Sequence, residues 1–257
     1  MHVPTVTLPG SVEMPLLGFG TWQIRGQDAY RAVRTALDVG YRHLDTATMY
    51  GNEDQVGRAL RDSGVPRDEI FITTKVPPDR VGRERATLDA SLSALDVGSV
   101  DLWLIHWPPG TGASVPMWRE LLAAREQGRA RAVGVSNYEV AELDGLTAAT
   151  GQTPAVNQVR WGPALFDAAT LAQHRERGVA LEGYSPFKTT NLSDPVLIGI
   201  ARAHGVDPAR VVLRWHVQHG VVVIPKSATP ERIAGNAQLD FVLADAEMAA
   251  IDALGRR

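Results

Sequence analysis

Four side chains with linked acid–base chemistry stand at or near the ends of neighbouring apolar segments: Asp45, Tyr50, Lys75 and His106. A free phenol has a pKa of about 10 and a lysine ammonium one of about 10.4. An ammonium beside a phenol stabilises the phenolate, so Lys75 is expected to lower the pKa of Tyr50, while Asp45 keeps the lysine charged and aimed. Tyr50 then suits proton donation to a developing alkoxide, and His106 suits a hydrogen bond to a carbonyl oxygen.

Each of these residues has an ordinary structural explanation when it is taken singly. An Asp–Lys ion pair between strands is common, and a histidine at a strand end more often packs than catalyses. The occurrence of all four side chains on three consecutive strands is far less typical of packing alone. The combination therefore predicts a centre that protonates a carbonyl oxygen.

Lysine is rare in this chain, which makes the placement of each lysine informative. Lys75, Lys188 and Lys226 are the only lysines among 26 basic residues, so arginine supplies the other 23. All three lie at or just past the C-terminal ends of expected strands, where a compact charge or an amine whose pKa can shift is useful. Lys226 and Ser227 precede Arg232, which falls near the start of the next expected helix. A helix start with such donors predicts a phosphate site.

Apolar strand-like runs alternate with amphipathic helix-like stretches along the whole chain. This alternation predicts a (β/α)₈ TIM barrel as a single domain over residues 1–257, with an open doubly wound sheet as the alternative. A β-hairpin before residue 16 is expected at the barrel bottom, and an extra helix is expected at the C-terminus. Asn52 and Gln55 predict a capping box. The expected strands are residues 16–20, 42–46, 69–75, 100–106, 130–136, 155–159, 179–184 and 221–225.

Composition and missing motifs exclude several other classes. The net charge of −3 and the pI near 6.2 give no basic field for nucleic acid or anionic membrane, so neither partner is expected. The absence of cysteine excludes disulfides and thiolate zinc sites, and with no visible secretory signal or membrane span it predicts a cytoplasmic protein. Rossmann, Walker and nucleophile-elbow motifs are absent. His216 and His219 have no third ligand in view, so no metal site is expected.

Short motifs at the expected strand ends form a specific combination: residues 40–47 (GYRHLDTA), 50–53 (YGNE), 71–75 (FITTK), 104–108 (LIHWP), 134–137 (GVSN), 157–158 (NQ), 184–186 (YSP) and 224–227 (IPKS), together with Arg232 and Asn236. Through these motifs the sequence resembles the aldo-keto reductase family over nearly the whole chain, and most of all its prokaryotic members related to 2,5-diketo-gluconate reductase.

The resemblance implies a monomeric barrel that binds NADPH without a Rossmann domain and transfers the 4-pro-R hydride to a small aldehyde or ketone. Tyr50 would be the general acid, Lys75 and Asp45 would tune it, and His106 would position the carbonyl. The implied substrate-binding residues are Trp22, Tyr50, His106 and Trp107. For the two tryptophans, core packing is the alternative.

The resemblance also implies a set of cofactor contacts. Ser136, Asn137 and Gln158 would hold the nicotinamide carboxamide, Tyr184 would stack on its ring, and residues 185–190 would cover the pyrophosphate. The 2′-phosphate and the adenine would be held by residues after the last strand. The full implied set is Thr21, Trp22, Asp45, Ser136, Asn137, Gln158, Tyr184, Ser185, Pro186, Phe187, Lys188, Lys226, Ser227 and Arg232, with Asn236 on the adenine.

Three departures from the family pattern bear on the substrate pocket. The chain stops directly after its last helix, and the loop over residues 107–116 is short, which predicts an open pocket with weak selection or a truncated chain. Residues 161–163 also lack the expected polar and aromatic side chains. Two alternatives to a reductase stay open: a non-catalytic NADPH-sensing or regulatory barrel, and a barrel isomerase or lyase acting on a phosphorylated metabolite.

Overall fold

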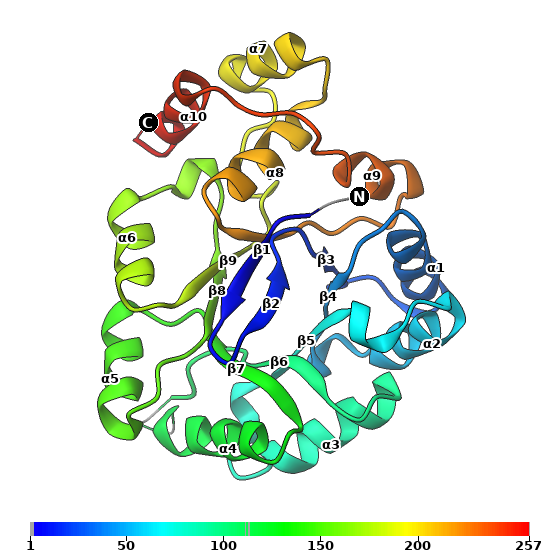
Figure 1. Ribbon diagram of the computed structural model, residues 1–257, viewed down its shortest axis with the longest axis vertical. Coiled ribbons are helices and arrows are strands. Elements are labelled where there is room, and N and C mark those ends of the chain that lie inside the picture. The colour runs from blue at the N-terminus through cyan, green and yellow to red at the C-terminus, as the bar shows by residue number, and fades with distance from the viewer. Residues whose placement is uncertain (1–2, 111, 113, 257) are drawn as a thin grey trace.

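Eight parallel strands run in sequence order around the centre of the molecule, as the computed structural model shows for residues 3–110, 112 and 114–256 (Figure 1). Parts of the 107–116 loop and the last residue lie outside these described residues. The strands are β3 (Phe19–Gly20), β4 (His43–Asp45), β5 (Phe71–Val76), β6 (Val100–Ile105), β7 (Ala130–Ser136), β8 (Val156–Arg160), β9 (Ala180–Tyr184) and β10 (Val222–Ile224).

Backbone contacts between the first and last strands close this sheet into a barrel. Leu17 bridges Val223 in parallel orientation, and the Gly18 amide donates to the Val223 carbonyl at 2.9 Å. A Cβ atom on Gly20 would lie 2.9 Å from the Ile224 carbonyl oxygen, so only glycine permits this approach. The predicted (β/α)₈ barrel is confirmed, and the open sheet is excluded.

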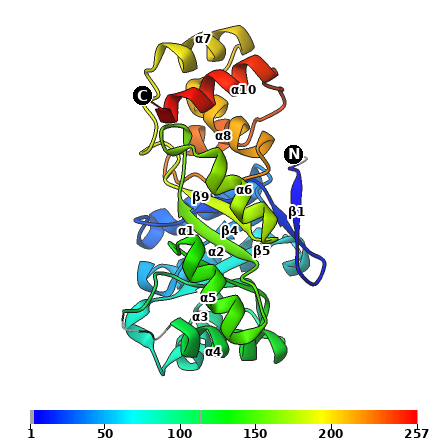
Figure 2. The same cartoon turned by 90° about the vertical axis from the view of Figure 1, so that its left-hand side faces the viewer.

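Helices surround the barrel because each presents one apolar stripe to the strands. In α1 (Gly26–Asp38) the buried side chains Ala29, Ala32, Val33 and Ala36 recur at helical spacing. Helices α7 (Pro195–His204) and α10 (Asp245–Asp252) extend beyond the ring, on one side of the barrel (Figure 2). The other helices are α2 (Glu53–Ser63), α3 (Glu84–Leu95), α4 (Ser114–Glu126), α5 (Val140–Thr150), α6 (Ala168–Glu176), α8 (Pro208–Gln218) and α9 (Pro230–Asn236).

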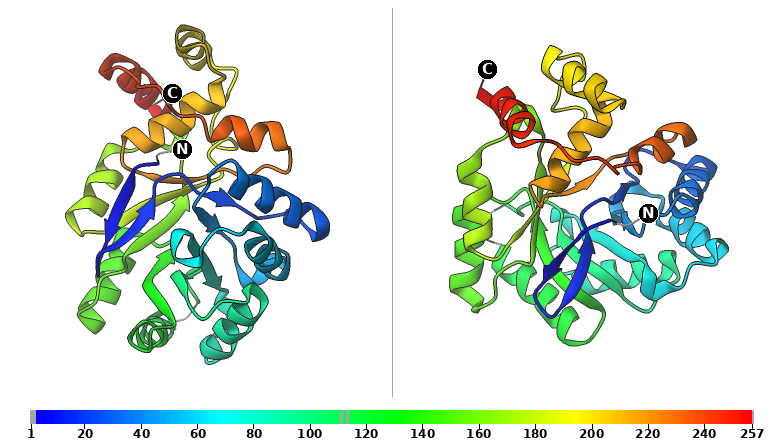
Figure 3. Two further views of the ribbon diagram at one scale, coloured as in Figure 1. Left: turned by 45° about the vertical axis from the view of Figure 1, so that its right-hand side comes forward. Right: turned by 45° about the horizontal axis from the view of Figure 1, so that its top comes forward.

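The antiparallel hairpin of β1 (Thr5–Leu8) and β2 (Val12–Pro15) lies across one end of the barrel (Figure 3). Its buried Leu8 and Met14 belong to the same apolar cluster as Phe71, the first residue of β5, and Leu102 of β6. Because these strand residues lie toward the strand starts, the hairpin covers the amino-terminal end of the barrel. The predicted hairpin position and the additional C-terminal helix are confirmed. The carboxyl end of the barrel, opposite the hairpin, stays open to a functional site.

The predicted capping box at Asn52 is wrong. The Asn52 side chain is fully buried and donates to the carbonyls of Thr21 and Ile24 at 2.9 and 2.8 Å, instead of capping α2. The Gln55 amide turns to Asp54. The Asn52 side chain therefore makes tertiary hydrogen bonds to the loop after β3 in place of the local cap. These bonds hold that loop beside the carboxyl end of β4.

Asp101 at the start of β6 is a buried carboxylate whose removal should destabilise the barrel. It accepts from Arg67 at 2.7 Å, from Arg131 at 2.9 Å and from the Ile72 backbone amide at 2.9 Å. We expect Asp101→Ala to lower the free energy of unfolding by about 2 kcal/mol, since it strands a buried donor. Urea denaturation measures this, with Asp101→Asn as the milder control. An unchanged midpoint would show that the three contacts contribute nothing to stability.

Within the described parts of the chain, no helix is both long and apolar enough to cross a membrane.

Candidate active site

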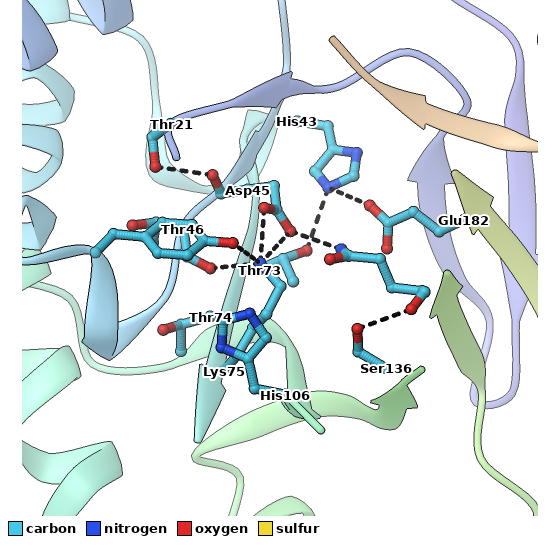
Figure 4. A network of polar contacts seen from close by, with 12 residues as sticks. Thr21, His43, Asp45, Thr46, Thr73, Thr74, Lys75, His106, Ser136 and Glu182 are labelled. Atoms are coloured by element: carbon cyan, nitrogen blue, oxygen red, sulfur yellow. Dashed lines mark hydrogen bonds and ion pairs between the residues drawn. The ribbon is translucent and has the colours of Figure 1, made fainter. Parts of the chain in front are cut away.

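Lys75 is the centre of a buried polar cluster at the carboxyl end of the barrel (Figure 4). Its Nζ donates to both carboxylate oxygens of Asp45, at 2.7 and 2.8 Å, and to the Thr46 carbonyl at 2.8 Å. The same ammonium lies 3.3 Å from the Tyr50 hydroxyl. The structure thus brings together Asp45 from β4, Lys75 from β5 and Tyr50 from the segment after β4.

A single helical turn, η1 (Thr48–Tyr50), carries the tyrosine over the lysine. The Thr48 hydroxyl donates to the Lys75 carbonyl at 3.0 Å and contacts Ser91 of α3, which fixes the turn to β5. Gly51 ends the turn with a φ of 64°, a conformation that glycine adopts without steric cost. The four residues between Asp45 and Tyr50 therefore bring the phenol back over the barrel mouth.

Burial decides the net pKa of Tyr50. It raises the pKa of the phenol to about 12, while the neighbouring Lys75 ammonium lowers it by less. The predicted direction of the lysine effect is confirmed, but the expected net lowering is wrong, because desolvation outweighs one charge partner that Asp45 already neutralises in part. Burial lowers the pKa of Lys75, but Asp45 and Tyr50 together raise it by more, so the amine stays an ammonium.

His106 lies beside this cluster as a neutral imidazole. Burial lowers its pKa to about 3, and Lys75 lowers it further. Its ring meets the Tyr50 ring edge to face, with centroids 5.7 Å apart. Its Nδ1 is buried without a hydrogen-bond partner among the described residues. A neutral imidazole carries one N–H, so His106 can offer that donor to an oxygen placed beside Tyr50.

A second set of polar side chains continues the network from Asp45 across β7, β8 and β9. The Gln158 amide donates to Asp45 Oδ2 at 2.8 Å, and the Ser136 hydroxyl donates to the Gln158 carbonyl at 2.7 Å. Tyr184 donates to Asn137 Oδ1 at 2.8 Å. Asn137 has a φ of 63°, a strained backbone conformation of the kind that clusters at functional sites.

A cavity of about 680 Å³ opens over this network at the carboxyl end of the barrel. Most of the site residues expected from the sequence line it, although Lys75 itself lies beneath the wall. Those in the wall are Trp22, Asp45, Tyr50, His106, Trp107, Ser136, Asn137, Gln158, Tyr184, Ser185, Pro186, Phe187, Lys188 and Lys226.

Exposed aromatic side chains form the rim of the cavity. Trp22 is 44% exposed and Trp107 is 46% exposed, so core packing is excluded for both. Met49, which the sequence interpretation did not include, adds a third apolar wall. The Lys188 ammonium lies 4.7 Å from the centre of the Trp22 ring, a cation–π contact that joins the loop after β9 to the loop after β3.

Four expected cofactor residues lie outside the cavity wall. Thr21 is fully buried, and its hydroxyl donates to the Asp45 carbonyl at 3.0 Å. The Ser227 hydroxyl accepts a hydrogen bond from the Thr229 backbone amide at 3.0 Å. Arg232 is exposed on α9 and Asn236 is buried at its end. Helix α9 has only seven residues, and it begins at Pro230, which has no amide donor, so its N-terminus adds little to the expected phosphate site.

Besides Met49, the residues of this region that the sequence interpretation missed include His43, Glu182 and Arg160. Arg160 lines the cavity beside Tyr184. His43 and Glu182 are fully buried below the cavity. Each of the three stands two positions from a residue that was singled out, Asp45, Tyr184 or Gln158. Since alternate residues of a strand share a face, this spacing was the signal that could have found them.

His216 and His219 lie on a packed face of the protein. His216 is fully buried, and His219 lies 2.8 Å from Asp252. Among the described residues, no group of three or more histidine, cysteine and acidic side chains is placed to hold a metal ion.

Comparison with known proteins agrees with this geometry. The model of the aldo/keto reductase family matches residues 16–256. The chain is 42% identical to morphine 6-dehydrogenase of Pseudomonas putida, covering 98% of this chain and 91% of that protein, and 39% identical to glycerol 2-dehydrogenase (NADP(+)) of Saccharomyces cerevisiae, covering 98% and 90%. The crystal structure of an aldo/keto reductase from Brucella melitensis superposes with a TM-score of 0.95 at 40% identity, over 98% of this chain and all of that one. The chain therefore belongs to the aldo-keto reductase family and is an oxidoreductase.

Proposed function

We propose that this protein reduces aldehydes or ketones to alcohols with NADPH, with Tyr50 as the general acid. The observation that carries the proposal is the contact of Lys75 with both Asp45 and the Tyr50 hydroxyl, with His106 beside them in the cavity wall. Two relatives add support, since the yeast protein is a glycerol 2-dehydrogenase that uses NADP(+) and the Pseudomonas protein is a morphine 6-dehydrogenase.

The proton side of the reaction follows from the distances. Tyr50 is protonated over the physiological range because burial holds its pKa near 12. When the phenol gives its proton to the substrate oxygen, the ammonium 3.3 Å away stabilises the phenolate that remains. Asp45 keeps that ammonium in place through two hydrogen bonds. His106 orients the substrate oxygen toward the phenol through its single N–H.

The cavity fits the expected cofactor in both chemistry and size. Its volume falls within the roughly 300–1,000 Å³ of ordinary ligand sites. Asn137 and Gln158 offer amide groups for a carboxamide, the Tyr184 ring offers a stacking face, and Lys188 and Lys226 offer cations for phosphate groups. Bound NADPH would supply the hydride. The residues named here would hold it with its nicotinamide near Tyr50.

The intact cluster favours an enzyme over an NADPH-sensing barrel, because a sensor needs the groove but no aligned proton donor. An isomerase or lyase of a phosphorylated metabolite has less support. Ser227 and Arg232 lie outside the cavity wall, so a small metabolite whose phosphate they held would be away from Tyr50, whereas an extended dinucleotide can continue beyond the cavity. We also propose that the protein is cytoplasmic and acts on small-molecule carbonyl compounds. We propose that it acts as a monomer, because described residues of one chain supply the whole catalytic cluster and the cavity wall around it. Size-exclusion chromatography with light scattering tests the monomer.

A panel of aldehydes and ketones tests the reaction itself, with loss of NADPH absorbance as the readout and NADH in parallel assays. We expect turnover of simple aldehydes with NADPH. Binding of NADPH without turnover of any compound would support the sensor, and absence of dinucleotide binding would overturn both readings.

The preference for NADPH over NADH should depend on Arg232. Only NADPH has a 2′-phosphate, and a guanidinium binds phosphate with strong charge-assisted hydrogen bonds. We expect Arg232→Ala to lower the affinity for NADPH about tenfold or more, equal to about 1.4 kcal/mol of binding free energy. The affinity for NADH should fall less than twofold. Quenching of tryptophan fluorescence measures both affinities, because Trp22 and Trp107 line the cavity.

Arg232→Lys is the matched control, since it keeps the positive charge and should retain part of the preference. An equal loss of affinity for the two dinucleotides in Arg232→Ala would place this side chain away from the 2′-phosphate.

A further inference from the structure

A second carboxyl group lies below the catalytic cluster, and the mechanism above does not use it. Glu182 of β9 is fully buried, and neither of its carboxyl oxygens has a well-formed hydrogen bond among the described residues. It pairs in register with Gln158 of β8, whose amide donates to Asp45. A buried charge without partners is costly, so the surroundings of Glu182 must favour its neutral form.

The neighbour that faces Glu182 most directly is His43 (Figure 4). Nδ1 of His43 lies 3.4 Å from the Pro15 carbonyl, which can only accept, so the ring proton belongs on Nδ1. Nε2 then presents its lone pair to the Thr73 hydroxyl at 3.2 Å and to Glu182 Oε1 at 3.8 Å. Burial lowers the pKa of His43 to about 3, so this ring is no cation. A protonated carboxyl suits such a neighbour, and a carboxylate does not.

The charged groups around Glu182 give the same direction. Burial raises the pKa of Glu182 to about 8, and the Asp45 carboxylate raises it too, whereas Gln158 and the Lys75 ammonium lower it. Lys75 is already bound to both oxygens of Asp45. On its other side Glu182 pairs in register with Val222 of β10, which has no charge. The titratable and charged groups facing Glu182 are therefore His43 and Asp45 of β4, Lys75 of β5 and Tyr50 of η1.

We propose that Glu182 is a positioning residue of the catalytic centre, which as a neutral carboxylic acid packs beside Gln158 without drawing the Gln158 amide away from Asp45, and leaves Lys75 with Asp45 as its sole counter-ion. This inference rests on the proposed reductase function. Ionisation of Glu182 at alkaline pH places two carboxylates against one ammonium. The second negative charge raises the pKa of Tyr50, which makes the phenol a weaker acid, and it attracts the Gln158 amide away from Asp45.

The pH dependence of turnover tests this role with two substitutions. Glu182→Gln keeps the shape of the neutral acid but cannot ionise, and Glu182→Ala removes the group. At about pH 6 we expect Glu182→Ala to lower kcat about tenfold or more, because it leaves a void beside Gln158, its register partner. Glu182→Gln fills that space and should keep kcat within about threefold of the wild type. At about pH 9.5 the wild type should lose at least about fivefold in kcat relative to Glu182→Gln. Superposed pH profiles of the wild type and Glu182→Gln would overturn the proposal.

Glu84→Gln is the matched control, because Glu84 is also buried but lies on α3, where it accepts the Gly82 amide. Its pH profile should match the wild type. If Glu182→Gln does not fold, the infrared carbonyl stretch of a protonated carboxyl gives a second test: it should be present at neutral pH and disappear on alkaline titration. Because burial also raises the pKa of Glu53, the band should persist in Glu53→Gln if it belongs to Glu182.

The infrared measurement needs neither cofactor nor substrate. A band that titrates in a protein without reductase activity would contradict the proposed function but leave the neutral acid established. Absence of the band at neutral pH, in a protein that reduces aldehydes, would overturn the role of Glu182 alone.

Discussion

Tyr50→Phe should lower kcat by at least about 10²-fold, because it deletes the proton that the substrate oxygen must receive. The change removes one oxygen atom and leaves the ring, so the edge-to-face contact with His106 persists. NADPH affinity should stay within about twofold, since a lost general acid affects the transition state and not cofactor binding. Steady-state kinetics and a fluorescence titration measure the two quantities separately.

Tyr30→Phe is the matched control for this substitution. The Tyr30 hydroxyl also donates a hydrogen bond, to Asp62 on α2, but it lies on an outer helix away from the cavity. Normal kcat in Tyr30→Phe together with a large loss in Tyr50→Phe assigns the effect to the site. Unchanged turnover in Tyr50→Phe would remove the phenol from the mechanism.

Lys75→Met should affect both activity and stability. The ammonium stabilises the phenolate of Tyr50, so its loss should lower kcat by about 10²–10³-fold, as for removal of a preorganised electrostatic group. The substitution also leaves Asp45, which is 2% exposed, without its cation. Breaking a buried ion pair in this way costs about 3–5 kcal/mol of folding free energy. Turnover assays and chemical denaturation measure the two losses.

The double variant Lys75→Met with Asp45→Asn separates these two effects. Replacing the stranded carboxylate by a neutral amide should recover most of the lost free energy of unfolding, while kcat stays low because no ammonium faces the phenol. Recovery of kcat in the double variant would mean that Lys75 acts only by neutralising the Asp45 carboxylate.

Much of the fold is encoded in local pattern. The alternation of apolar runs with amphipathic helices predicted eight strands, and the structure forms all eight within one to three residues of the expected ends. The longest difference is at the first strand, where the expected segment 16–20 is reduced to Phe19–Gly20, because Leu17 is used to close the barrel against Val223. Barrel topology then requires the polar strand ends to converge at one mouth, which is why Asp45, Tyr50, Lys75 and His106 could be grouped without coordinates.

The environment of each group depended on contacts between segments far apart in the chain. The sequence places a lysine near a tyrosine, but only packing shows that desolvation outweighs that lysine in the pKa of Tyr50. Asn52 carries a capping pattern, yet the loop after β3 uses its side chain.

Residue types and their spacing determined the strand order, the mouth of the barrel and the four side chains gathered there, because period and chain connectivity are local properties. The tertiary structure alone decided how deeply each polar group is buried and what faces it. Glu182 shows the difference most clearly: nothing next to it in sequence reveals that His43, 139 positions earlier, presents a neutral ring to it inside the barrel. Burial and charge pairing are sums over neighbours in space, so they appear only when the barrel is closed.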